Sequence, residues 1–149
     1  MTQLLYTMQF KGKAALANDA GTVLKATTTA PSCTISTVVG DAGVTGHLQP
    51  INGGQASFES QVTFTGETSF QEVGSLTFGD KGHRLYFSTV GQGHIGPSTD
   101  PQLKHGSVMW KVERGEGQFV GTTGLITSNF FVSESGEVTD NHFGVIFIK

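Results

Sequence analysis

The sequence predicts an all-β protein: a closed antiparallel β-barrel of about eight strands with minimal helix. The chain of 149 residues holds 21 glycines and many β-branched residues and phenylalanines. Almost no segment repeats apolar residues at helical spacing, whereas several alternate apolar and polar residues, as residues 58–64 do. We favour a barrel over a sandwich because a closed sheet leaves no threonine-rich or valine-rich strand with an exposed edge.

Length and charge define the class of protein. The chain suits a single β-barrel domain that spans residues 1–149. Charged residues make up only 14% of the chain and the net charge is -3, so no basic stripe exists for nucleic acid or an anionic membrane. No apolar run approaches the roughly 20 residues that cross a bilayer, the first ten residues lack a secretory signal, and the lone Cys33 excludes an internal disulfide framework. We therefore expect a soluble cytoplasmic protein with no nucleic-acid or membrane partner.

The first half of the chain contains β-branched segments separated by turn signals. Asn, Asp and Gly residues predict turns at 18–21 and 40–43, and Pro31 predicts a break in a strand. Asn52-Gly53 is the strongest local hairpin signal and predicts a further turn. The strands predicted here cover residues 1–10, 22–29, 32–39 and 44–51.

The second half has sharper alternation and predicts a meander. Its predicted strands cover residues 55–65, 68–78, 83–90, 107–113, 122–133 and 138–149, with turns at 66–67, 79–82 and 134–137. The meander is interrupted by residues 91–106, the longest predicted loop. Loops of this length often serve binding, so we expect a mobile cover over one barrel mouth or, equally, an ordered excursion that joins neighbouring subunits.

A glycine ladder precedes the last hairpin and predicts a tight turn and the sharp bends that a closing barrel requires. Its pattern Gly-x-Gly-x-Phe-x-Gly-x-x-Gly is filled by Gly115, Gly117, Phe119, Gly121 and Gly124. The pattern resembles the late hairpin of allene oxide cyclase-like and dirigent-like β-barrels. Residues 74–78 and the segment around Gly91 and Gly93 also look like an uncharacterised bacterial family of the same barrel type, which the chain resembles most closely. The resemblance implies an eight-stranded barrel, commonly trimeric in the plant members. It does not carry over the cyclase chemistry, because residues 4–16 lack the carboxylate that the plant enzymes have on the first strand.

Glu72 is the candidate catalytic residue, because it is the only carboxylate within its predicted strand. Burial there would raise its pKa and suit it to general acid or base chemistry, whereas a position at the rim would make it merely solubilising. A tryptophan with a few polar groups is typical of an apolar ligand pocket, although Trp110 also fits a simple core position. The candidate ligand-binding residues are Tyr86, His94, His105, Trp110, Asn129 and His142.

The predicted loop contains two imidazoles and a carboxylate, at His94, His105 and Asp100, a set of ligands that zinc or iron accepts. No short spacing between the histidines preorganises them, and loop histidines are mostly solvated. We therefore expect neither a metal nor another cofactor.

Two functions of different class fit these patterns. The first is an uncharacterised small bacterial-type β-barrel protein that binds a small apolar molecule in the barrel, in its enzymatic form a cyclase or isomerase that shapes its substrate. The second is a non-catalytic oligomeric module, structural or for interaction, with a side-chain-filled barrel. Both are expected to form a homo-oligomer, a dimer or a trimer. An internal cavity lined by aromatic residues would favour the first function, and a packed core the second.

Overall fold

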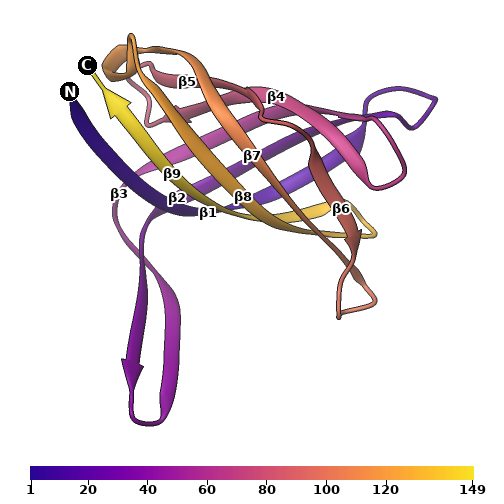
Figure 1. Ribbon diagram of the computed structural model, residues 1–149, viewed down its shortest axis with the longest axis horizontal. Helices are drawn as coiled ribbons and strands as arrows, with labels where there is room; N and C mark the ends of the chain where they lie inside the picture. Colours follow the sequence, from indigo (N-terminus) through magenta and orange to yellow (C-terminus); the bar gives the residue numbers. More distant parts are fainter.

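The computed structural model describes residues 1–149 as an all-β chain without an α-helix (Figure 1), which confirms the prediction of an all-β protein with minimal helix. One turn of 3-10 helix, η1 (Gly117–Phe119), separates two of its strands. No helix is long and apolar enough to cross a membrane. The strands are β1 (Thr2–Leu16), β2 (Val23–Gly40), β3 (Gly43–Phe64), β4 (Ser69–Phe78), β5 (His83–Thr89), β6 (Gly93–Pro97), β7 (Leu103–Glu116), β8 (Thr123–Ser133) and β9 (Glu137–Ile148).

All nine strands belong to one antiparallel sheet, whose pairings close a ring of eight strands. The ring passes from β1 through β2, β3, β4, β5, β7, β8 and β9 and returns to β1. The short β6 pairs with the first residues of β4 and of β7, where β5 has already ended. It therefore continues the position of β5 in the ring toward one of the two mouths.

The ring is closed over a short length between β1 and β2, which pair only from Lys11↔Thr29 to Leu16↔Leu24. The first half of β1 pairs with β9 instead, and β2 and β3 leave the ring together. Their register shifts between Pro31 and Cys33, and beyond this point residues 33–50 form a two-stranded arm that projects from the body (Figure 1).

The middle of the ring is filled by aromatic side chains that point inward. Trp110 is fully buried and packs against Phe87, with ring centroids 4.4 Å apart, and against Phe58 at 5.5 Å. At the end near the chain termini, Phe119 from η1 packs on Phe78, which in turn meets Tyr6. These aromatic contacts fill that end of the ring, and a pocket lies at the opposite mouth.

Two turn predictions were wrong. Residues 91–106 are not a loop, because β6 and the start of β7 pair with each other and leave only residues 98–102 as a connection. Asn52-Gly53 does not form a turn but lies within β3, opposite the irregularity at Pro31. The glycine there leaves room for the Ser32 side chain, whose Oγ donates a hydrogen bond to the Gly54 carbonyl at 2.6 Å. The hairpin turns instead at residues 41–42, inside the region predicted from 40–43.

The tight turn predicted at the glycine ladder is confirmed. Gly117 and Gly121 have positive φ angles of 63° and 72°, which a residue with a side chain rarely adopts. Gly115 is required for a different reason, since a Cβ atom there would collide with the Phe119 backbone carbonyl. The ladder thus folds Phe119 back over the end of the ring.

Candidate functional site

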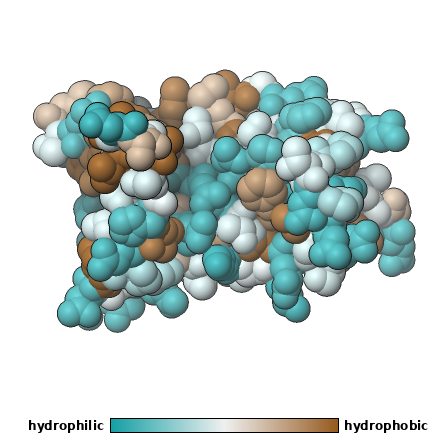
Figure 2. Space-filling view, turned by 90° about the horizontal axis from the view of Figure 1, so that it is seen from below, coloured by the Kyte–Doolittle hydropathy of each residue, from teal (hydrophilic) through white to brown (hydrophobic).

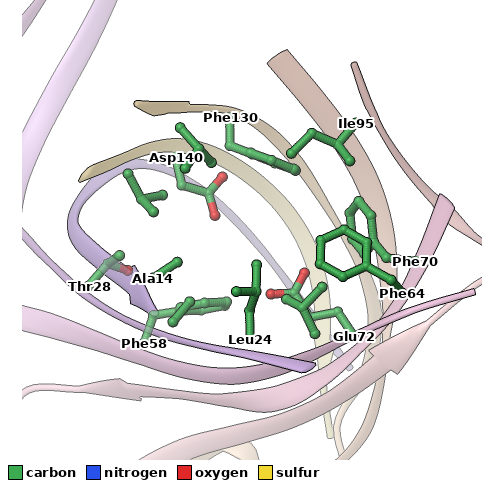
Figure 3. A pocket seen from close by; sticks show the side chains of 14 residues that line it. Ala14, Leu24, Thr28, Phe58, Phe64, Phe70, Glu72, Ile95, Phe130 and Asp140 are labelled. Atoms are coloured by element: carbon green, nitrogen blue, oxygen red, sulfur yellow. The ribbon is translucent and has the colours of Figure 1, made fainter. Parts of the chain in front are cut away.

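A small pocket opens at the mouth opposite Phe119, with a volume of about 60 Å³ (Figure 3). Such a volume has room for about four or five water molecules and is well below the roughly 300 Å³ of a drug-sized site. Eleven of its fourteen lining residues are hydrophobic. The lining comprises Ala14, Leu24, Ala26, Thr28, Phe58, Val62, Phe64, Phe70, Glu72, Ile95, Phe130, Val132, Val138 and Asp140.

Two carboxylates lie in this apolar pocket, Glu72 from β4 and Asp140 from β9 (Figure 3). They are almost fully buried, with 6% and 5% of their surface exposed. Each accepts a short hydrogen bond from a serine on the neighbouring strand: Ser60 Oγ to Glu72 Oε2 at 2.6 Å, and Ser128 Oγ to Asp140 Oδ1 at 2.6 Å. In both pairs the serine precedes the carboxylate by twelve residues. The pocket thus contains two hydroxyl–carboxylate pairs of the same construction.

The environment of Glu72 raises its pKa to about 8. Burial is the main cause, since it disfavours the charged form, and the negative charge of Asp140 adds to it. The hydrogen bond from Ser60 and the indole N–H of Trp110 act in the opposite direction. Trp110 Nε1 has no partner within normal hydrogen-bonding geometry. We therefore infer that the nearby indole N–H dipole stabilises the ionised form of Glu72 without a hydrogen bond. Glu72 is therefore mostly protonated at neutral pH.

Asp140 also contacts His142, whose Nε2 lies 2.9 Å from Asp140 Oδ2. The imidazole is buried among aromatic rings, 4.3 Å from Phe10 and 5.1 Å from Trp110 between ring centroids. Its Nδ1 is buried without a partner. The tautomer with its proton on Nε2 fits this arrangement best, because it donates to Asp140 and leaves no buried N–H unpaired. Asp140 then accepts two hydrogen bonds, from Ser128 and His142, and His142 fixes the orientation of the Asp140 carboxylate.

Three of the predicted site residues come together inside the ring. Glu72 and Trp110 face each other, and Trp110 packs edge-on against His142. Trp110 occupies a core position, as the alternative interpretation of the sequence had it. Of the three, only Glu72 reaches the open pocket.

The other predicted site residues lie on the outer face and do not reach the pocket. Tyr86 is covered by the guanidinium of Arg114, 3.5 Å from the ring centroid, and its hydroxyl donates to Glu116 at 3.0 Å. His105 Nε2 lies 2.7 Å from the Asn129 side-chain oxygen, and both residues are exposed. His94 is exposed as well, on β6.

The sequence interpretation missed Asp140, Ser60 and Ser128. Asp140 shares the alternation of Val138 and His142, so its inward direction could be inferred once His142 was considered an interior residue. Ser60 shares the alternation of Phe58, but a single serine in an apolar face carries no signal of its function.

Metal binding finds no support in the geometry. No group of three or more His, Cys, Asp and Glu side chains is arranged to hold a metal ion, and His94, Asp100 and His105 do not converge. The polar residues that line the pocket are Thr28, Glu72 and Asp140, and the two carboxylates are held from behind by Ser60 and Ser128.

Comparisons with protein-family models, with curated proteins and with solved structures give no match to this chain.

Proposed function

We infer that the ring of strands is a closed β-barrel that binds a small molecule at its open mouth. The ligand has a short apolar body and one cationic or hydrogen-bond-donating end, of which a primary alkylamine is the simplest example. The observation that supports this inference is the position of Glu72 and Asp140, two buried carboxylates in an otherwise apolar pocket. Burial of such groups is unfavourable unless they have a partner, and a pair of them is typical of a functional site.

The hydrogen bonds that the two carboxylates still lack favour a ligand that donates a hydrogen bond. Asp140 already accepts hydrogen bonds from Ser128 and His142, whereas Glu72 Oε2 accepts one from Ser60 and Glu72 Oε1 accepts none from a side chain. A ligand ammonium group at Glu72 would satisfy Oε1 and offset the negative charge that Asp140 places beside it. An anionic ligand would instead meet two acidic groups.

The apolar walls favour a short hydrocarbon body. Phe64, Phe70, Phe130 and Ile95 surround the approach to Glu72 (Figure 3). Each methylene buried against them would contribute about 0.8 kcal/mol. The small volume admits only about four or five heavy atoms, so a longer ligand would leave the rest of its chain outside.

The raised pKa of Glu72 supports a second, enzymatic function of the same pocket. A carboxyl group with a pKa of about 8 is protonated at neutral pH and is therefore matched to proton transfer, as an isomerase or cyclase needs. The aromatic packing around Trp110 supports the other alternative, a non-catalytic module, since it fills the middle of the ring. Of these functions, ligand binding rests on the fewest assumptions.

Titration calorimetry or NMR with n-butylamine, n-butanol and butanoate tests the binding proposal. We expect the amine to bind most tightly and butanoate not to bind. The variant Glu72→Gln should lower the amine affinity by about tenfold or more, because it removes the group that becomes the anion. Glu59→Gln, an exposed carboxylate on the neighbouring strand, is the matched control. Equal binding of the three probes, or an unchanged affinity in Glu72→Gln, would refute the proposal.

A further inference from the structure

The arm of residues 33–50 has one apolar and one polar face. Residues paired across an antiparallel hairpin point to the same side, so its register defines both faces. The apolar face carries the pairs Cys33↔Pro50, Ile35↔Leu48, Thr37↔Gly46 and Val39↔Val44. The polar face carries Thr34↔Gln49, Ser36↔His47 and Val38↔Thr45, and Ser36 Oγ lies 3.2 Å from His47 Nδ1. No charged side chain interrupts the apolar face.

This apolar face is left uncovered by the rest of the chain. Val39 is 80% exposed and Val44 67%, and the only side-chain hydrogen bond from the arm to the body runs from Cys33 Sγ to the Thr7 carbonyl. An isolated two-stranded hairpin is marginally stable in water, and uncharged strands with free edges tend to pair with other chains. The arm therefore needs a partner surface to keep its extended form.

A complementary apolar surface lies on the outer face of the body beside the root of the arm. Strand registers place six outward-facing residues next to one another across β1, β9, β8 and β7. We call this surface the outer patch; it consists of Leu5, Met109, Leu125, Phe143, Val145 and Phe147. Thr7, the contact of Cys33, pairs with Phe143, so patch and arm root adjoin each other. Figure 2, seen from the side toward which the arm projects, shows hydrophobic side chains at the left of the molecule, where Figure 1 places the arm.

Area decides which surface of a second copy can cover the arm. Eight residue pairs on two strands give an arm face of about 26 by 10 Å, or about 260 Å². Two arms packed only on each other would bury about 500 Å², which is below the roughly 1,000 Å² that a specific interface needs. If each arm lies on the outer patch of the other copy, the buried area doubles to about 1,000 Å² and reaches that threshold.

We propose that the protein forms a two-fold symmetric dimer in which the apolar face of each arm covers the outer patch of the other copy. Such an arrangement is self-complementary, because each copy supplies one arm and one patch. The adjacency of patch and arm root places the symmetry axis beside Cys33 and Thr7. The outer patch lies on the outer face of the strands, whereas the pocket between Glu72 and Asp140 lies inside the ring and is lined by none of the patch residues, so the dimer proposal does not depend on the ligand proposed above.

Two neighbouring valines give a matched test of the arm. Val39 lies on the apolar face and Val38 on the polar face, and both are exposed, at 80% and 59%. Sedimentation equilibrium of the full chain at micromolar concentration should show a dimer. Val39→Lys should raise its dissociation constant at least about 100-fold, because it buries an unpaired charge at two symmetric sites. Val38→Lys should leave the dissociation constant unchanged.

A second pair of variants tests the outer patch. Leu125→Lys should weaken the dimer as Val39→Lys does, whereas Val73→Lys, an exposed valine on β4 outside the patch, should have no effect. A monomeric wild-type protein, equal effects of Val38→Lys and Val39→Lys, or a dimer insensitive to Leu125→Lys would each overturn the proposal. Hydrogen exchange of the arm in the wild-type protein tests the dimer even if a variant does not fold. Arm amides should gain protection as protein concentration rises, and protection independent of concentration would also overturn the proposal.

Discussion

Glu72→Gln should change how the stability of the protein depends on pH. In the folded protein burial and Asp140 raise the pKa of Glu72 from 4.5 to about 8. Between these two values the folded state keeps a proton that the unfolded state has lost. The protonated carboxyl therefore supports folding fully below pH 4.5, and this contribution is lost as pH rises toward 8. The glutamine variant cannot ionise and keeps a neutral acceptor for Ser60.

The expected magnitude follows from the same two values. The interval from 4.5 to about 8 corresponds to about 5 kcal/mol in the free energy of unfolding, of which about 4 kcal/mol falls between pH 5 and pH 8. Water that enters the open mouth will stabilise the ionised form and reduce this loss, so we expect about 2–4 kcal/mol. The wild-type protein should therefore lose stability relative to Glu72→Gln over this range, at up to about 1.4 kcal/mol per pH unit.

Urea denaturation from pH 5 to pH 8.5 measures this difference, with the fluorescence of Trp110, the only tryptophan, as the probe. Because the indole lies beside Glu72, the fluorescence of the folded protein should also titrate with a midpoint near pH 8. Glu59→Gln serves as control and should follow the wild-type curve, since Glu59 is exposed. Parallel stability curves for the wild type and Glu72→Gln, together with a flat fluorescence titration, would refute the assignment of a buried, protonated carboxyl.

Three further predictions follow from the pocket and the ring. The affinity for n-butylamine should rise from pH 6 to pH 8, because the ammonium group must displace the proton of Glu72; calorimetry should detect that proton as a buffer-dependent enthalpy. Asp140→Asn should lower the fluorescence midpoint of Trp110, because it removes the negative charge that helps raise the pKa of Glu72, and an unchanged midpoint would contradict this coupling. Gly74→Ala should destabilise the protein by about 1–3 kcal/mol in urea denaturation, since its Cβ would collide with the Glu59 carbonyl, whereas Gly54→Ala, with only ordinary contact at 3.8 Å, should change stability little.

Local alternation predicted which residues of a strand share a face, because it depends on neighbouring residues alone. The structure shows which of the two faces is the inner one: Phe58 and Ser60 are buried together, and so are Val108 and Trp110. The outward direction of Tyr86 could be inferred in the same way, since it alternates with the buried Leu85 and Phe87. Tyr86 was nevertheless predicted to contact a ligand, because its residue type was given more weight than its position in this alternation.

Pairings between distant segments could not be inferred from local signals. Residues 91–106 contain few apolar residues, and their strand character comes from pairing with partner strands, as in Ser69↔His94 with β4 and Ile95↔Gly106 with β7. Asn52-Gly53 has the composition of a hairpin turn, but the competing turn between Gly40 and Gly43 allows a longer run of paired residues on both sides. In both cases tertiary pairing outweighed local propensity.

The carboxylate pair shows where inference from the sequence ends. Ser60 and Glu72 lie diagonally on β3 and β4, and Ser128 and Asp140 lie diagonally on β8 and β9, so each hydrogen bond belongs to a single hairpin that alternation predicts. The two hairpins are connected through β5 and β7 on one side of the ring, and the ring closes around them on the other side through the six residue pairs between β1 and β2. The pKa of Glu72 depends on Asp140 across that closure, so weakening the β1–β2 pairing should lower the fluorescence midpoint of Trp110 even though neither carboxylate is changed. Gly12→Ala provides this perturbation, because its Cβ would collide with the Thr27 carbonyl on β2. A destabilised Gly12→Ala protein that keeps the wild-type midpoint would show that the two carboxylates interact without the closed ring.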